Sequence, residues 1–154
     1  MTPIQTRLMR GAAAAALLLW SNGALARQDA QAGCTVATLK GSYGYTVTGS
    51  LAGGPTPGPF AAVGRLTFDG AGNFQNSRTI SRNGLITPRV QGTGTYSIEP
   101  DCAGTMLFSD GGVVTLSNDI VVDADGDAFR LIATSPGTVL TADGRRLAGG
   151  GRKR

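Results

Sequence analysis

Five side chains of this 154-residue chain combine polarity with strand-like spacing, and they are the ones best suited to ligand chemistry: Tyr43, Tyr45, Arg78, Arg82 and Tyr96. Under strand alternation, Arg78 and Arg82 share one face with Phe74 and Ile80. If that face points into a core, the buried arginines need a partner and would hold an anionic or carboxylate-bearing ligand. If it points outward, they are solubilising charges, and a one-residue shift of register exchanges the two alternatives.

Catalytic chemistry finds little support in the composition. The chain has no histidine, which excludes a Ser-His-Asp triad, a Cys-His dyad and a histidine-ligated zinc site. Glu99 is the only glutamate and stands next to Pro100 in an expected turn, and no two carboxylates form an acid–base pair. We therefore predict no catalytic residue and no cofactor, and favour a non-enzymatic protein while leaving enzymatic activity open.

Three spaced carboxylates, Asp123, Asp125 and Asp127, suit a hard cation such as calcium. The EF-hand pattern requires Gly at its sixth position and Glu at its twelfth, and here Ala128 and Thr134 occupy those positions. Asp125-Gly126 between two apolar runs instead predicts a hairpin turn and no metal site, with a weak adventitious calcium site as the alternative.

The two cysteines, Cys34 and Cys102, predict one disulfide in an oxidising compartment. Closing a loop of about 69 residues stabilises a fold by roughly 4 kcal/mol in the chain-entropy model. The bond would join the start of the first strand to the turn after the fourth.

The N-terminus has the features of a signal peptide. Arg7 and Arg10 precede an apolar run of about ten residues, which is shorter than the roughly 20 residues of a membrane span. Ala24-Leu25-Ala26 fits the cleavage pattern, so residues 1–26 are expected to be removed and 27–33 to form a leader. The protein is then exported, to the periplasm or the exterior, without an integral membrane span.

The formal charge of +4 is concentrated at the ends of the chain. Between residues 34 and 141, six basic residues stand against eight acidic ones, a net charge of about −2. A nucleic-acid binder carries its basic residues on a folded face among aromatics, so no nucleic acid is expected. Residues 148–154 are predicted to be a disordered basic tail, with contact to anionic lipid or polysaccharide as the alternative; oligomeric state is left open.

Alternating runs joined by Gly-rich turns predict an all-β fold, with a barrel domain over residues 34–147. Asp69 to Asn73 and Asn83-Gly84 are typical hairpin turns, and Thr87-Pro88 must lie at an edge or bulge. Closing the sheet into a small antiparallel barrel would remove exposed edges. The expected strands are 39–51, 60–68, 74–82, 89–98, 105–109, 113–122, 128–134 and 138–141.

Three runs, CTVATLKGSYGY (34–45), AVGRLTFDGAGN (62–73) and GTGTYSIEPDCAG (92–104), resemble small exported bacterial proteins of unassigned function. That group is similar to the allene oxide cyclase-like, calycin-type barrel. The resemblance covers nearly all of the mature chain and implies eight antiparallel strands. Plant allene oxide cyclases would imply cyclisation of a fatty-acid epoxide in an apolar barrel, but their catalytic residues match no positions here, so no active site is carried over.

Three functions follow from these patterns. The first is a binding or interaction module for a small apolar ligand in the barrel mouth, or for an envelope partner. The second is a cyclase or isomerase that works by confining its substrate. The third is a structural envelope protein whose barrel is filled by side chains.

Overall fold

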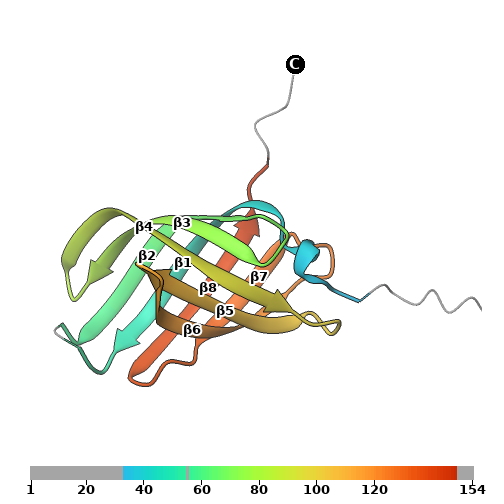
Figure 1. The fold of residues 1–154 in the computed structure, drawn as a ribbon. Coiled ribbons are helices and arrows are strands. Elements are labelled where there is room, and N and C mark those ends of the chain that lie inside the picture. The colour runs from blue at the N-terminus through green and yellow to red at the C-terminus, as the bar shows by residue number, and fades with distance from the viewer. Residues whose placement is uncertain (1–32, 55, 149–154) are drawn as a thin grey trace, which may run out of the picture.

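The chain forms a closed barrel of eight antiparallel strands, in which each strand pairs with the next and β8 pairs with β1 (Figure 1). The computed structural model describes residues 33–54 and 56–148. Within these ranges no helix is long and apolar enough to cross a bilayer. A short 3-10 helix, η1 (Val36–Thr38), precedes the strands: β1 (Gly41–Leu51), β2 (Gly58–Phe68), β3 (Asn73–Arg82), β4 (Leu85–Ile98), β5 (Ala103–Asp110), β6 (Val113–Val122), β7 (Ala128–Ala133) and β8 (Thr138–Arg146).

The predicted fold class and all eight strands are confirmed; most strand limits agree within two residues, and two were wrong by more. β4 begins at Leu85, four residues before the expected start. β8 continues to Arg146 rather than ending at Thr141. The polar composition of this stretch concealed an alternation in which Ala142 and Gly144 face the core, while Thr141, Asp143 and Arg145 face solvent.

One half of the barrel is filled by aromatic and aliphatic side chains from the inward positions of every strand. The Phe68 ring lies at its centre, 5.3 Å from Tyr43 and 5.0 Å from Tyr96 between ring centroids. Inward glycines make room for these rings: a Cβ at Gly94 would lie 2.3 Å from Phe74 Cζ. The largest fully buried side chains are those of Tyr43, Phe68, Phe129, Leu39, Leu66, Met106, Ile120 and Asn118.

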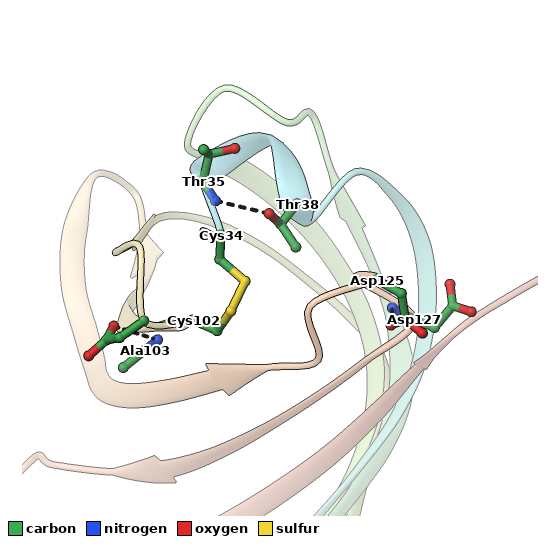
Figure 2. The surroundings of a disulfide bond; sticks show 8 residues. Cys34, Thr35, Thr38, Cys102, Ala103, Asp125 and Asp127 are labelled. Atoms are coloured by element: carbon green, nitrogen blue, oxygen red, sulfur yellow. Dashed lines mark hydrogen bonds between the residues drawn. A yellow bond between two sulfur atoms is a disulfide. The ribbon is translucent and has the colours of Figure 1, made fainter. Parts of the chain in front are cut away.

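This filled half ends under η1, which the disulfide holds in place (Figure 2). The Cys34–Cys102 bond is confirmed, with the two Cα atoms 4.9 Å apart, and Cys34 N donates a hydrogen bond to Pro100 O at 3.1 Å. The Tyr96 hydroxyl donates to the backbone carbonyl of Leu39 at 2.8 Å. We call this the closed end of the barrel.

Arg146, the last residue of β8, also covers the closed end. Its guanidinium pairs with Asp127 at 3.0 Å, donates to Gly126 O at 2.8 Å and lies over the Tyr43 ring at 5.0 Å. Its charge therefore stabilises the barrel end. The predicted signal peptide (1–26), almost all of the leader (27–33) and most of the basic tail (148–154) lie outside the described residues.

The turn between β6 and β7 uses its carboxylates locally. Asp125 Oδ1 accepts a hydrogen bond from Asp127 N at 2.9 Å (Figure 2), and Asp123 lies 3.6 Å from Arg130. These contacts confirm the predicted hairpin turn. Among the residues that the structure covers, no three His, Cys, Asp or Glu side chains gather closely enough to hold a metal ion.

The opposite end of the barrel carries a long hairpin, which we call the β3–β4 arm (residues 80–90). Asn83 and Gly84 both have positive φ, 47° and 85°, which confirms the predicted type I′ turn. A bulge at Arg89, with φ 54°, shifts the register beside Thr87-Pro88, also as predicted. Because β4 pairs with β5 only from Thr93 onward, the arm projects past the barrel wall (Figure 1).

Candidate functional site: a cavity in the open half of the barrel

The face of β3 that carries Arg78 points into the barrel. Pairing of Phe74 with Phe68, and of Arg78 with Gly64, continues the inward rows of β2. Asn76 on the same face is buried. The sequence left open whether the face of β3 that carries Arg78 points inward or outward, and in the structure it points inward.

A cavity of about 60 Å³ occupies the half of the barrel away from η1. Its walls come from seven of the eight strands and are largely apolar, with polar groups contributed by a tyrosine, an arginine, an asparagine and a threonine. The lining residues are Tyr45, Val47, Phe60, Ala62, Arg78, Phe108, Thr115, Leu116, Asn118, Leu131, Leu140 and Ala142.

Solvent reaches this half of the interior, so we call this end the mouth. Inward residues here, such as Val47, Phe60 and Leu116, are only half-buried, although they point into the barrel. In the filled half, Tyr43 and Met106 are completely buried. The same alternation therefore produces a dry core at one end and an accessible cavity at the other.

Within the part of the chain that the structure describes, four buried polar atoms lack a hydrogen-bond partner. Tyr45 Oη and Asn118 Oδ1 belong to residues that line the cavity, and both amide atoms of Asn76 lie next to Arg78 in the same wall of the barrel. Asn118 Nδ2 donates to Met106 O at 3.0 Å, so only its oxygen is left free. Folded proteins pair the large majority of such atoms, and a group of them around one cavity indicates a place where water or a ligand completes the hydrogen bonds.

Arg78 supplies the positive charge of the cavity. Its guanidinium lies over the Phe108 ring at 5.5 Å, and no ion pair within residues 33–54 and 56–148 involves it. Tyr45 and Arg78 flank Gly64 in one hydrogen-bonded row. A Cβ at Gly64 would lie 2.7 Å from Arg78 Cβ, so only glycine permits this approach.

The Tyr45 hydroxyl is a hydrogen-bond donor at neutral pH. Burial raises the pKa of Tyr45 above its usual 10.0, and the Arg78 guanidinium opposes that rise. Arg78 is close enough to lower the pKa of the hydroxyl through its charge and through hydrogen bonding, but the contact does not reach the geometry of a full hydrogen bond. A protonated phenol beside an unpaired guanidinium presents two donors to an anionic group.

Asn76 adds a further polar group next to Arg78. Both side chains converge on Gly92: a Cβ there would lie 2.9 Å from Asn76 Nδ2 and 3.8 Å from Arg78 Nη1. The missing side chain at Gly92 thus leaves room for the amide and the guanidinium on the inner face of the barrel.

The five residues singled out from the sequence occupy three places. Tyr45 and Arg78 meet at the cavity. Arg82 lies over the Phe60 ring at 5.9 Å, nearer the mouth. Tyr43 and Tyr96 lie at the closed end, where their hydroxyls donate to the carbonyls of Gly126 and Leu39.

Sequence reasoning missed Asn76 and Asn118. Both occupy inward positions of alternating runs: Asn118 lies between Leu116 and Ile120 on its face, and Asn76 between Phe74 and Arg78. A lone asparagine at a core position of a strand is a signal that could have been used, because a buried amide needs hydrogen-bond partners.

The size of the cavity limits what it can hold. A volume of about 60 Å³ accommodates roughly four water molecules. A head group of a few heavy atoms therefore fits, and any longer chain must extend past Phe60 toward the mouth.

Comparisons with models of protein families, with curated proteins and with solved structures found no match. The class of the protein therefore rests on its own structure. It is a closed eight-stranded antiparallel barrel with one disulfide. One half of the barrel is filled by side chains, and the other half holds a small cavity with a few polar groups in a largely apolar lining.

Proposed function

We propose that this protein binds a small amphipathic molecule with an anionic head group, a carboxylate in the simplest case. The head group lies against Arg78, Tyr45 and Asn118, and the apolar part extends along Phe60 and Leu140 toward the mouth. The observation that carries the proposal is the set of buried polar atoms without partners beside Arg78, which forms no ion pair with any residue that the structure describes.

The chemistry of these groups favours a carboxylate over a neutral head. A guanidinium donates two parallel hydrogen bonds to a carboxylate, and such charge-assisted bonds are about twice as strong as neutral ones. The protonated Tyr45 hydroxyl supplies a third donor. Asn118 Oδ1 is an acceptor, so a ligand that also carries a hydroxyl or N–H group would complete the site.

Binding is favoured over catalysis because the lining offers groups that hold a ligand but no carboxylate that could move a proton. Burial keeps Tyr45 protonated, which suits a donor and not a general base. The filled half would by itself suit a structural protein, and the cavity is what favours a binding protein.

Two further proposals depend on the sequence. The disulfide is typical of oxidising compartments, and with the N-terminal segment it supports action outside the cytoplasm. The closed eight-stranded barrel supports kinship with the allene oxide cyclase-like, calycin-type group, on the strength of the resemblance described above.

Titration with straight-chain carboxylates from butanoate to decanoate, and with the matching 1-alkanols, tests the proposal. Calorimetry gives the affinity, and backbone amide shifts of the cavity-lining residues give the location. Hydrogen bonds to a charged group contribute about 1.5–3 kcal/mol, so the carboxylates should bind at least tenfold more tightly than the alkanols.

Variants of two arginines separate a site effect from a change in overall charge. Arg78→Gln should remove the preference for carboxylates, Arg78→Lys should restore part of it, and Arg65→Gln on the exposed outer face of β2 should leave it unchanged. The proposal is wrong if no carboxylate shifts the cavity residues at millimolar concentration, or if Arg78→Gln binds carboxylates as the native protein does.

A further inference from the structure

Large apolar side chains are exposed at the tips of three hairpins around the mouth. Leu85 and Ile86 follow the turn of the β3–β4 arm and are 65% and 63% exposed. Val113 follows the β5–β6 turn at 68%, and Val139 lies just after the β7–β8 turn at 65%. Figure 1 shows these turns at the end of the barrel opposite η1. Exposed apolar residues gathered at one end of a protein indicate an interaction surface.

Charge is distributed unequally between the two ends. Near the mouth, Arg82 and Arg89 belong to the β3–β4 arm, and Asp110 is the one acidic residue of the neighbouring turns that the structure describes. The turns at the closed end carry six carboxylates: Asp69, Glu99, Asp101, Asp123, Asp125 and Asp127. Four basic residues lie near them, Lys40, Arg130, Arg145 and Arg146, and two of these pair with Asp123 and Asp127, so the net charge of this end is about −2. An anionic surface would therefore attract the mouth and repel the closed end.

The form of the arm argues against pairing with another strand. The outer edge of β4 is free before Thr93, but it contains Pro88 and the bulge at Arg89. Proline removes a donor and a bulge turns the edge away, and both features block edge-to-edge pairing. The arm and the other two hairpin tips present instead separate exposed apolar side chains, and the arm also carries Arg82 and Arg89.

We infer that the mouth rim, defined as Leu85, Ile86, Val113 and Val139 with Arg82 and Arg89, docks onto an anionic lipid bilayer. The apolar tips enter the head-group region, and the arginines contact lipid phosphates. The barrel then stands with its mouth toward the lipid and its acidic closed end in solution. This inference goes beyond ligand binding and does not depend on it.

Nuclear magnetic resonance in the presence of lipid vesicles locates the docking surface directly. The probe is a vesicle of phosphatidylcholine with about 30% phosphatidylglycerol and a small fraction of doxyl-labelled lipid. It is added to the native protein in the form in which its host produces it. The amides of Leu85, Ile86 and Val113 should broaden more strongly than those of Val63 and Val121, which are equally apolar but lie on the side of the barrel. Equal broadening at both sets, or broadening at the closed end alone, overturns the inference.

Vesicle flotation with matched variants provides the second measurement. Leu85→Ser with Ile86→Ser should weaken partitioning at least tenfold, because two apolar side chains lose their burial in lipid. Val63→Ser with Val121→Ser should leave partitioning unchanged. Arg89→Gln should weaken it several-fold at low salt, where charges are screened least, and Arg65→Gln should have less effect.

A second copy of the chain is the competing occupant of the rim. Sedimentation without lipid should give a monomer for the native protein and for the Leu85→Ser, Ile86→Ser variant alike. A native dimer that this variant dissociates would assign the rim to self-association and overturn the lipid inference. Loss of docking to vesicles would leave carboxylate binding in the cavity unaffected, so the two proposals fail separately.

Discussion

Replacement of Tyr45 by phenylalanine should stabilise the free protein, which is unusual for a change in a barrel core. The Tyr45 hydroxyl is buried and has no hydrogen-bond partner among residues 33–54 and 56–148. Such a group costs about 1–3 kcal/mol relative to an apolar group of the same shape. Because phenylalanine keeps the ring contacts, we expect the free energy of unfolding to rise by about 1 kcal/mol.

Tyr96→Phe is the matched control at the closed end. It removes the same atom, but there the hydroxyl donates to Leu39 O at 2.8 Å. The loss of that bond should lower the free energy of unfolding by about 1 kcal/mol. The two variants should therefore shift the free energy of unfolding in opposite directions and differ from each other by about 2 kcal/mol, although the same atom is removed in both.

Urea unfolding with the disulfide intact, followed by far-ultraviolet circular dichroism, measures this difference. With an m-value of about 1–2 kcal/mol/M for a domain of this size, the two midpoints should lie about 1–2 M apart. Tyr45→Phe should also weaken carboxylate binding, since the ligand loses a donor. If Tyr45→Phe destabilises the protein as much as Tyr96→Phe does, the hydroxyl has a partner in solution, and the argument from unpartnered atoms is refuted.

Three other predictions concern the closed end and pH. Replacing Cys34 and Cys102 by serine should lower the free energy of unfolding by about 4 kcal/mol, since the bond closes a long loop; an unchanged urea midpoint would contradict this. Arg146→Gln should cost about 1–3 kcal/mol, because it removes an ion pair, hydrogen bonds to backbone carbonyls and the contact with a tyrosine ring. Arg145→Gln, on the exposed face of the same strand, should change thermal unfolding little. Burial raises the pKa of all three tyrosines above 10.0, so the folded state holds their protons more tightly; stability from this source should be complete below pH 10 and fall as pH rises further. Absorbance at 295 nm should show tyrosinate forming together with unfolding, and titration of all three before any loss of structure would contradict the prediction.

The fold was largely predictable because its determinants are local. Alternation predicted each strand, and residues that accept positive φ, such as Asn83-Gly84, predicted the reversals. The errors occurred where local composition conflicted with tertiary packing. The end of β8 is polar in composition, yet position 144 faces inward. It must be glycine because the Phe129 ring fills the space beside it: a Cβ at Gly144 would lie 2.2 Å from Phe129 Cζ.

The candidate site was predictable only in part. Tyr45 and Arg78 were identified from residue type and strand periodicity, and the structure brings them to one cavity. The same reasoning grouped them with Tyr43 and Tyr96, whose hydroxyls bind backbone at the closed end. Periodicity assigns a side chain to a face of a strand, but it does not give the height of that side chain along a closed barrel.

The sequence by itself determined the strands, the turns and the pairing of two cysteines, because each depends on neighbouring residues or on there being only two thiols. Only the tertiary structure decided which face of β3 points inward, since a shift of one residue would reverse it. Tertiary structure also decided that one half of the barrel is filled and the other holds a cavity. That division depends on which side chains from seven strands meet at one level, and it is set when the barrel closes.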